Sequence, residues 1–249
     1  MEEPITLIMS RLHENEEDIR NMALSMLIDH IKKDPSIITV EIVEELILLY
    51  KSLKSTPKQK LADILSFIAL TSDDIQTLTY RIKGGVTDLK IFGIQYVKKL
   101  VNLIIEYNRE NDNNSLELFK GSDIKKEELE IVNTECIEFL IDHNAEIDCI
   151  DFLYEIKEMN RIIDKVDEYN YERVMQYLKG LSSFDNEINY VMLEIYKKMN
   201  KLIDEVLLYV KLRNIGKIEE IINRVDFHQR CQIAYILSKL NIRIENKEL

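Results

Sequence analysis

Apolar side chains recur along most of this chain at intervals of three and four residues. The first clear stripe runs from Ile19 to His30 and continues through about three helical turns. These intervals match the roughly 3.6-residue period of an α-helix and not the two-residue alternation of a half-buried strand. The pattern therefore predicts a succession of amphipathic α-helices. Further stripes lie at Val40, Val43, Leu46, Ile47 and Tyr50, at Leu61, Ile64, Leu65 and Ile68, and at Leu89, Phe92, Tyr96, Val97, Leu100, Val101 and Ile104.

Residues that start or stop helices stand between the stripes. Proline loses no hydrogen bond at the first helical position, and glycine reaches positive φ angles after a helix end. On this basis Asp34-Pro35 ends one helix and Gly84-Gly85 ends another, and the stripe from Leu89 to Ile104 predicts one longer helix. Helix starts are predicted at Thr56-Pro57, at Asp73 and Asp74, and after Asn170, which we expect to act as a cap.

A polar segment from Asn108 to Ser122 interrupts the helical pattern. Its asparagine-rich sequence, followed by Gly121, is typical of a turn-prone loop. We therefore expect a loop near residues 108–122 that separates an N-terminal helical block, residues 1–110, from a C-terminal block of helical hairpins, residues 123–249. Stripes in the C-terminal block are more regular and are joined by only a few polar residues.

A weak internal repeat is visible in the C-terminal block at an offset of 56 residues. Residues 147–163 align with residues 203–219, and Asn170-Tyr171 then aligns with Asp226-Phe227. Short helices that pair as hairpins and stack in a row produce such a period. The repeat predicts an α-solenoid-like array of antiparallel helical hairpins.

Composition supports an all-α fold class. The chain has 249 residues, of which 46% are apolar, three are proline and six are glycine. Such an apolar fraction excludes global disorder, and so few turn formers argue against a many-stranded sandwich or barrel. Met1 is followed by an acidic segment, no apolar run approaches the roughly 18 residues of a membrane span, and the three cysteines are far apart. We expect a soluble intracellular protein without membrane contact.

Charge makes nucleic acid an unlikely partner, because the formal net charge is −12. The charge is nevertheless uneven, since residues 51–100 carry nine basic and four acidic side chains. Two interpretations stay open for this segment. A basic face could meet an acidic partner, or the lysines are the solvated sides of amphipathic helices.

Candidate chemistry is sparse. The chain has no glycine-rich phosphate loop, no paired metal-binding cysteines and no zinc-protease motif. Cys136, His143 and Cys149 lie within fourteen residues, but their spacing fits no compact zinc site, and the cysteines fall on apolar stripes. The acidic pair at Glu127 and Glu128 is explained by the dipole of a helix start, and the tyrosines at 169, 171, 177, 190 and 196 by helix packing. We predict no catalytic, cofactor-binding or metal-binding residue.

Several segments carry a resemblance to a known family. They are His143-Asn144-Ala145-Glu146 with residues 151–156, Ala62-Asp63-Ile64-Leu65-Ser66, Tyr80-Arg81-Ile82, Gly93 with Tyr96-Val97, residues 167–174 with Tyr177-Leu178, residues 207–214 and residues 233–237. Taken in the order of the chain, they resemble the large toroid-bearing non-ATPase subunit of the proteasome regulatory particle base, the non-ATPase regulatory subunit 2 family. The resemblance covers roughly residues 5–242. It departs at Phe92, where the family usually has tryptophan, and ends where the proteasome/cyclosome repeats of the toroid should begin.

The resemblance implies a non-catalytic scaffold of the proteasome 19S regulatory particle, located in cytoplasm and nucleus. It implies contacts with other regulatory-particle subunits, including the ATPase ring, and no cofactor. The family's ubiquitin and shuttle-factor sites lie on the toroid, so we expect none of them on this chain. The alternative from the residues themselves is a generic helical-repeat adaptor in trafficking or chaperone assemblies; an enzyme with an unrecognised helical site is a third hypothesis.

The last predicted helix is apolar around much of its circumference. Ile233, Ile236, Leu237 and Leu240 follow helical spacing and are expected to pack on the preceding hairpin. Tyr235 and its neighbours place further apolar groups on other sides of the same helix. A helix that is apolar on most sides expects burial from two directions. We therefore predict an unfilled edge here that self-associates, orders poorly or packs against a neighbouring molecule when the chain is isolated.

Overall fold

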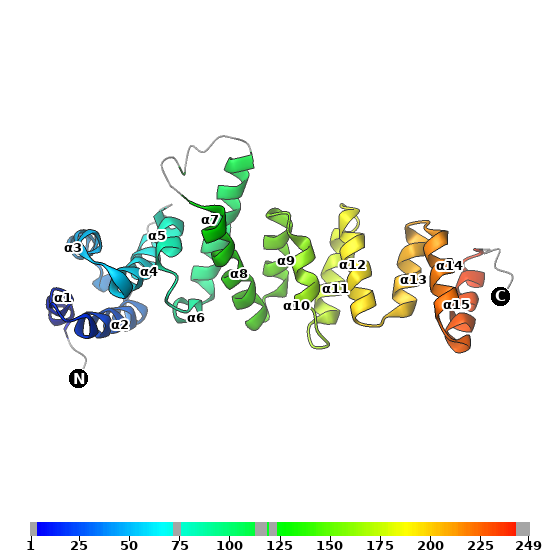
Figure 1. Ribbon diagram of the computed structural model, residues 1–249, viewed down its shortest axis with the longest axis horizontal. Coiled ribbons are helices and arrows are strands. Elements are labelled where there is room, and N and C mark those ends of the chain that lie inside the picture. The colour runs from blue at the N-terminus through cyan, green and yellow to red at the C-terminus, as the bar shows by residue number, and fades with distance from the viewer. Residues whose placement is uncertain (1–3, 72–75, 113–118, 120–123, 243–249) are drawn as a thin grey trace. The chain divides into compact units, whose positions relative to one another are not determined.

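The computed structural model describes residues 4–71, 76–112, 119 and 124–242 (Figure 1). Regular structure in these ranges consists of helices alone, which confirms the predicted all-α class with a solenoid-like succession of helices. The chain forms two compact units, residues 1–156 and residues 157–249, which we call the first and second units. The predicted division into blocks 1–110 and 123–249 stays a prediction, because residues 113–118 and 120–123 of the connecting segment lie outside the described residues.

The first unit contains nine α-helices and a short 3-10 helix among its described residues. Its centre is the pair α4 and α5, and α4 also packs against α2, α3 and α7. α7 in turn packs against α8 and α9. The helices are α1 (Ile5–Leu12), α2 (Glu17–Lys33), η1 (Pro35–Ile37), α3 (Val40–Ser52), α4 (Ser55–Thr71), α5 (Gln76–Gly84), α6 (Leu89–Phe92), α7 (Ile94–Asp112), α8 (Lys126–Asp142) and α9 (Glu146–Glu155).

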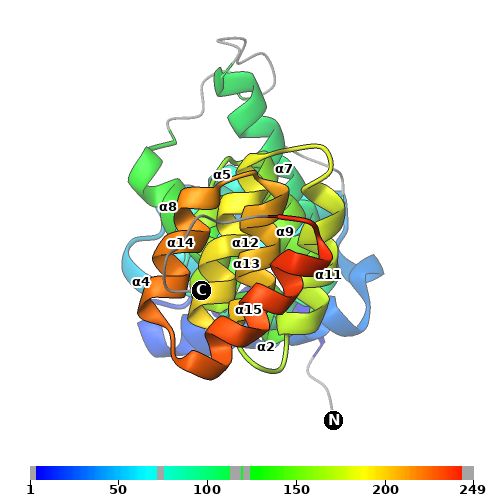
Figure 2. The same ribbon diagram turned by 90° about the vertical axis from the view of Figure 1, so that its right-hand side faces the viewer.

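The second unit contains six α-helices and a 3-10 helix among its described residues. α12 lies at its centre and packs against α10, α11 and α13, while α14 packs against α13 and α15. Figure 2 shows α14 and α15 on the side that faces the viewer. The helices are η2 (Met159–Arg161), α10 (Ile162–Lys165), α11 (Tyr171–Leu181), α12 (Glu187–Lys198), α13 (Leu202–Lys211), α14 (Ile215–Arg224) and α15 (Phe227–Lys239).

Most predicted helix ends lie where the sequence indicates. α2 ends just before Asp34-Pro35, and α5 ends at Gly84, where Gly85 has a φ of 68°. α4 begins at Ser55, one residue before the predicted cap at Thr56, which is within the usual uncertainty of helix ends. The predicted helix start at Asp73 and Asp74 lies outside the described residues. Residues 108–112 of the predicted loop are helical and belong to α7.

The single long helix predicted from Leu89 to Ile104 is wrong. Gly93 divides it into α6 and α7, with φ 83° and ψ 173°, a conformation that is essentially restricted to glycine. The break lets two aromatic rings on either side of it meet the same partner. Phe92 and Tyr96 both contact Phe67 of α4, with ring centroids 5.2 Å and 5.8 Å apart. Contact among the three rings, of which Phe92 and Tyr96 are buried, offsets the loss of helical hydrogen bonds at the glycine.

The prediction that Asn170 caps the following helix with its side chain is also wrong. Asn170 directly precedes α11, but its side chain makes no hydrogen bond to that helix. Its Oδ1 instead accepts a hydrogen bond from the Asp167 backbone N–H at 2.9 Å, and its Nδ2 donates to the Lys165 carbonyl at 2.9 Å. The amide therefore ties together the turn between α10 and α11, because a buried side chain satisfies the nearest unpaired backbone groups.

The 56-residue repeat is confirmed in the backbone. Asn144 and Asn200 lie 56 positions apart and both have a φ of 54°, and Lys157 and Arg213 repeat the same relation at 60° and 55°. The residue after each asparagine donates its backbone N–H to the carbonyl five residues back, from Ala145 to Leu140 at 2.9 Å and from Lys201 to Tyr196 at 2.8 Å. This bond pattern is the Schellman ending of a helix. Equivalent positions therefore turn the chain in the same way, which is the local basis of the hairpins.

α15 follows the predicted apolar pattern only in part. Ile233 and Leu237 are buried, whereas Leu240 is 47% exposed because it lies beyond the last turn of the helix. On its other side Phe227 and Tyr235 are 75% and 61% exposed. An uncovered apolar side is thus present, and self-association of this edge stays a prediction.

Candidate functional site

The residues considered for chemistry in the sequence do not form a reactive site. Cys136 and Cys149 are buried, and burial raises the pKa of the Cys136 thiol to about 12. The His143 ring stacks on Phe139 with centroids 3.9 Å apart, and its Nδ1 lies 2.7 Å from the Phe139 carbonyl oxygen. Within the described ranges, His, Cys, Asp and Glu side chains form no group of three or more that could hold a metal ion. The same ranges include no helix that is both long and apolar enough to cross a membrane.

The tyrosines that the sequence analysis attributes to helix packing do not share one environment. Tyr171 and Tyr196 are buried, whereas Tyr169 and Tyr190 are exposed. Tyr171 lies under the Lys201 ammonium, 5.1 Å from the ring centroid, beside a hollow of about 440 Å³ in the second unit. Helix packing accounts for the buried rings.

The most unusual group of side chains in the described residues is a buried cluster around Asp63 and Arg81. Asp63 lies on α4 and Arg81 on α5, and both are almost completely buried. Arg81 Nη1 donates to Asp63 Oδ1 at 2.9 Å. The carboxylate also accepts three backbone N–H groups, from Gly85 at 2.9 Å, Val86 at 3.1 Å and Thr87 at 2.8 Å. One carboxylate thereby fixes the loop that follows α5.

Arg81 connects this loop to α8. Its Nη1 donates to the Thr87 carbonyl at 2.8 Å, and its Nη2 donates to Glu135 Oε2 on α8 at 2.7 Å. Burial alone lowers the pKa of Arg81, but the charges of Asp63 and Glu135 outweigh burial and hold the pKa above its usual value. The guanidinium therefore stays charged and joins three separate segments of the first unit.

Gly84 is required by the same cluster. A Cβ atom at this position would collide with the Asp63 carboxylate and crowd the Asp63 backbone. Glycine is thus needed for the close approach of α5 to α4, in addition to its role at the helix end. This requirement explains why the helix ends on two glycines and not on one.

A second buried polar contact lies between α4, α5 and α7. The Ser66 hydroxyl donates to the Thr77 carbonyl at 2.7 Å and lies 2.7 Å from the Tyr96 hydroxyl. Burial raises the pKa of Tyr96, so its phenol stays protonated. Ser66 and Asp63 both come from the segment 62–66, and Arg81 comes from the segment 80–82. These two segments carry the N-terminal part of the family resemblance.

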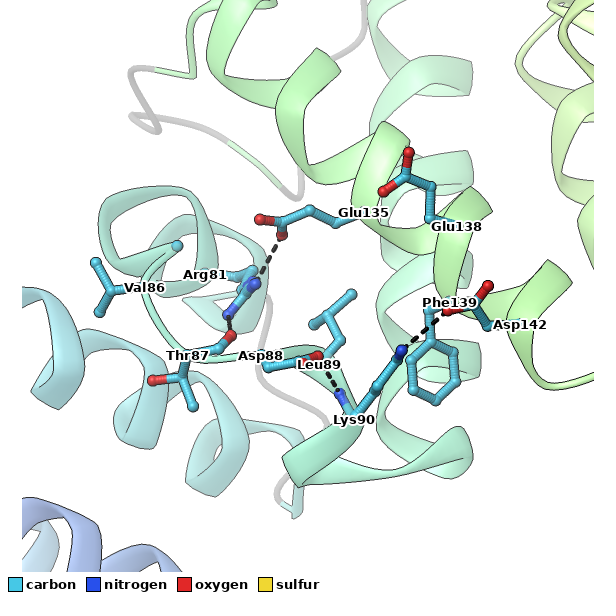
Figure 3. Close-up of a pocket in the computed structure, with 11 residues that line it drawn as sticks. Arg81, Val86, Thr87, Asp88, Leu89, Lys90, Glu135, Glu138, Phe139 and Asp142 are labelled. Carbon is cyan, nitrogen blue, oxygen red and sulfur yellow. Dashed lines mark hydrogen bonds and ion pairs between the residues drawn. The ribbon is translucent and has the colours of Figure 1, made fainter. Parts of the chain in front are cut away.

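A pocket of about 360 Å³ lies between the loop at 85–88 with the start of α6 and the side of α8 (Figure 3). Figure 3 shows Arg81 between Thr87 and Glu135, and Lys90 reaching across toward Asp142 of α8. Lys90 Nζ lies 2.9 Å from Asp142 Oδ2, and both side chains are 55% exposed. The hydrogen bond to Asp142 raises the pKa of Lys90. The pocket is lined by Arg81, Gly85, Val86, Thr87, Asp88, Leu89, Lys90, Glu135, Glu138, Phe139 and Asp142.

The pocket offers binding chemistry and no assembled catalytic group among the residues that line it. It contains carboxylates, two cationic side chains and apolar side chains, but no cysteine, serine or histidine. Sequence reasoning missed this site. A usable signal was present, since Asp63 stands between Leu61 and Ile64 of an apolar stripe, and a charge at such a position must find a buried partner.

Comparison with known proteins agrees with these observations. The family model for the RPN1 N-terminal domain matches residues 5–249. The chain is 33% identical over 252 aligned positions to the 26S proteasome regulatory subunit RPN1 of Encephalitozoon cuniculi, which covers 97% of this chain and 30% of that protein. It is 29% identical to the 26S proteasome non-ATPase regulatory subunit 2 of Dictyostelium discoideum, with coverage of 97% and 28%.

The chain therefore spans about a third or less of the length of these relatives. A relative from Schizosaccharomyces pombe, the 26S proteasome regulatory subunit rpn1, is 27% identical and covers 80% of this chain. The family match extends over both compact units and includes the Asp63–Arg81 cluster and the helical repeat. This chain therefore belongs to the RPN1 N-terminal domain family.

Proposed function

We propose that this chain is a non-catalytic scaffold segment of the proteasome regulatory particle base, and that it supports ubiquitin-dependent protein degradation through protein–protein contacts. The observation that carries the proposal is the family match over residues 5–249. The names of the relatives, regulatory subunit and non-ATPase regulatory subunit, support the same proposal. The location that follows from this role is cytoplasm and nucleus.

The proposed mechanism is geometric. Short helices joined by repeated turns give a surface that holds its shape, and binding to such a surface needs no reactive side chain. In the first unit the Asp63–Arg81 cluster fixes the loop at 85–88 against α8. The proposed partners are other regulatory-particle subunits, including the ATPase ring. We expect no ubiquitin or shuttle-factor site on this chain.

Crosslinking mass spectrometry on the assembled regulatory particle tests the proposal. The full chain carries an affinity tag and is purified with its assembly before crosslinking of lysine side chains. We expect crosslinks from this chain to regulatory-particle subunits, among them ATPase subunits. Co-purification with a trafficking or chaperone assembly, and without proteasome subunits, would establish the adaptor alternative instead.

A titration of the isolated chain with ubiquitin chains tests the assignment of ubiquitin binding. We expect no saturable binding, because the proposed scaffold role requires no ubiquitin site on this chain. Saturable binding at micromolar concentration would overturn that part of the proposal.

A further inference from the structure

The 56-residue repeat places an equivalent groove in each unit. In the first unit the groove lies between α7 and α9, and α8 packs against both helices. In the second unit it lies between α11 and α13, and α12 packs against both. α8 and α12 are equivalent, as are α9 and α13, because the turns at Asn144 and Asn200 connect each pair in the same way. The two grooves can therefore be compared position by position.

The groove of the first unit is filled by the chain itself. Lys98 Nζ of α7 lies 2.9 Å from Asp148 Oδ1 of α9, so the carboxylate is paired within the unit. Leu140 of α8 and Phe152 of α9 add completely buried apolar side chains to the lining. The hollow that remains has a volume of about 190 Å³.

The groove of the second unit is larger and lacks this ion pair. Its hollow has a volume of about 440 Å³. Asp204 of α13 stands 56 positions after Asp148 and lines the hollow. The Asp204 carboxylate is half-buried and has no ion pair and no hydrogen bond in the part of the chain that the structure describes. A carboxylate that is partly withdrawn from water and has no partner is stabilised by a cation that enters the hollow.

Two buried phenols stand beside this carboxylate. Tyr171 of α11 lines the hollow, and Tyr196 of α12 stands 56 positions after the apolar Leu140. The two tyrosines are 8% and 3% exposed, and neither hydroxyl has a hydrogen-bond partner among the described residues. Burial, and after it the charge of Asp204, raises the pKa of each phenol to about 12. Both phenols therefore lie near Asp204, stay protonated and offer a free oxygen.

An occupant of the hollow can reach the Tyr171 oxygen. This oxygen has no partner and is not among the buried side-chain atoms that are closed to solvent. A buried tyrosine hydroxyl usually finds a hydrogen-bond partner. A group that brings a donor into the hollow therefore satisfies an oxygen that the chain itself leaves unpaired.

Lys201 shows that an ammonium group fits this groove. Its Nζ lies 5.1 Å from the centroid of the Tyr171 ring, a cation–π contact. Lys201 is exposed and makes no ion pair with Asp204 in the described structure, so the carboxylate stays open to a second cation. An anionic occupant is the alternative, because Lys179 also lines the hollow, but such an occupant would be repelled by Asp204 and Glu172.

The open acceptors suit a primary ammonium group better than a guanidinium. An ammonium group has three N–H donors in a tetrahedral arrangement, whereas the donors of a guanidinium lie in one plane. Asp204, Tyr171 and Tyr196 supply three separate acceptors. The first unit already contains the corresponding contact, since Lys98 pairs with Asp148 in the equivalent groove.

We propose that the groove between α11 and α13 binds a lysine side chain of a partner protein, which pairs with Asp204 as Lys98 pairs with Asp148. The proposal deepens the scaffold function by naming the chemistry of one contact, and it rests on that function for its role in the cell. Binding by the isolated chain is measured without the proteasome. Its failure is therefore a separate result from the absence of crosslinks in the assembled particle.

Fluorescence anisotropy with the full chain and labelled peptides tests the proposal. The probe is an N-acetylated peptide of about twelve residues with two lysines four positions apart among alanine and glutamine, neighbours on one helix face. One comparison peptide has glutamine in place of both lysines and a free N-terminal amine, and another has glutamate in place of both lysines. We expect saturable binding of the lysine peptide alone.

Three outcomes of this titration would overturn the proposal. The first is no saturable binding of the lysine peptide up to about 1 mM, a typical weak-interaction limit. Equal binding of the peptide with the free amine would show that a terminal amine suffices and that no lysine is recognised. Preferred binding of the glutamate peptide would establish the anionic occupant.

The repeat supplies a matched control for the carboxylate. Asp204→Asn and Asp148→Asn remove the same charge from equivalent positions, but Asp148 is already paired with Lys98. We expect Asp204→Asn to weaken binding by about tenfold and Asp148→Asn by less than about twofold, because a charge pair acts strongly only at close range. Equal weakening by both variants would show general attraction to an acidic protein and refute the site.

Removal of the two phenol hydroxyls separates binding from folding. Tyr171→Phe with Tyr196→Phe keeps both rings and removes two oxygens that have no partner in the described structure. We expect no loss of stability and a weakening of binding by about three- to tenfold, the effect of one or two hydrogen bonds. Tyr190→Phe, at an exposed position of α12, is the control. Reduced stability with unchanged binding would show that the hydroxyls are only structural.

A gain-of-binding variant guards against variants that fail to fold. Lys201→Met removes the ammonium group that occupies the Tyr171 ring, and Lys179→Met removes the other cation of the hollow, eight positions along α11 from Tyr171. We expect tighter binding of the lysine peptide by Lys201→Met than by Lys179→Met. Weaker binding by Lys201→Met would show that Lys201 itself holds the peptide and would contradict the proposal.

Methyl NMR locates the bound peptide. Met175 lines the hollow, and Met22 is an exposed methionine of the first unit. We expect the Met175 methyl signal to shift during the titration and the Met22 signal to stay in place. An unshifted Met175 signal during saturable binding would place the peptide elsewhere and overturn the assignment of the groove.

Discussion

Each compact unit uses a charged side chain to fix a segment that is not regular helix, but the two units do so at different depths. In the first unit Asp63 is buried on α4 and accepts three backbone N–H groups of the loop after α5. In the second unit Lys198, at the end of α12, donates to the carbonyls of Ile163, Asp164 and Val166 at 2.7, 3.0 and 2.8 Å. The Asp63 carboxylate accepts hydrogen bonds from three backbone N–H groups, and the Lys198 ammonium donates hydrogen bonds to three backbone carbonyls.

The difference in burial determines how much stability is lost when each charged side chain is removed. Asp63 and Arg81 have side chains that are 0% and 1% exposed, so either charge needs the other. Lys198 is an exposed residue, and water can replace it on the carbonyl oxygens at the end of α10. The comparison therefore predicts that the stability of the first unit depends strongly on its buried charges, and that the stability of the second unit depends moderately on Lys198.

The largest effect is expected for Asp63→Asn. The change leaves the Arg81 charge buried with one carboxylate partner instead of two and places an amide N–H₂ group against backbone donors. We expect a loss of about 3–5 kcal/mol in the free energy of unfolding, the range for breaking a buried ion pair. Urea unfolding followed by circular dichroism measures it. Asp18→Asn, an exposed carboxylate of α2, is the matched control, and an equal loss in both variants would contradict the buried role.

A smaller but substantial effect is expected for Gly84→Ala. The new methyl group meets the Asp63 carboxylate, so α4 and α5 must separate or the carboxylate must move. Overpacking of this kind costs about 1–3 kcal/mol. Gly180→Ala serves as the control, because a Cβ there meets nothing within 4 Å and α11 gains helix propensity. Thermal unfolding of both variants checks the expectation; equal stability of Gly84→Ala and the parent chain would show that the cluster adapts.

Lys198→Met is expected to have a moderate effect. The substitution keeps the length of the side chain and removes the three donors at the end of α10. We expect a loss of about 1–2 kcal/mol, in the range for hydrogen bonds from a charged group. Lys197→Met, which removes an exposed ion pair with Glu194, is the control and should cost no more than about 0.5 kcal/mol. Hydrogen exchange in residues 162–171 should increase only for Lys198→Met.

The smallest expected effect is a difference in cysteine reactivity between the two units, and its measurement needs no mutation. Cys136 and Cys149 of the first unit are buried, and Cys231 of the second unit is exposed. A thiol reagent should therefore modify Cys231 quickly in the native chain and reach the other two only on unfolding. Peptide mass spectrometry after a short reaction identifies the modified cysteines. Rapid modification of Cys136 would mean that the first unit opens readily.

Helices and their repeat were predictable from the sequence for a local reason. Side chains three and four positions apart share a helix face, so an apolar stripe needs only its own neighbours to be recognised. The glycines at 84 and 85 marked a helix end by the same kind of local rule. Gly93 carried a local signal too, but the strong apolar stripe across it favoured a continuous helix.

The candidate site was less predictable, because its partners come from distant parts of the chain. Arg81 is 18 positions from Asp63 and 54 from Glu135. No spacing rule connects such residues. The family resemblance included both Asp63 and Arg81 but gave no reason for their presence, which the buried pair now supplies.

The sequence by itself determined the helical class, most helix ends, the 56-residue period and the family of this chain, because these depend on local pattern and residue identity. Tertiary structure alone decided which charges are buried and what they hold. Asp63 and Asp88 are the same residue type, yet one is buried beneath a loop and the other is exposed at the start of α6. The physical reason is that the desolvation and the pairing of a charge depend on all the groups packed around it. These groups come together only when helices distant in sequence meet.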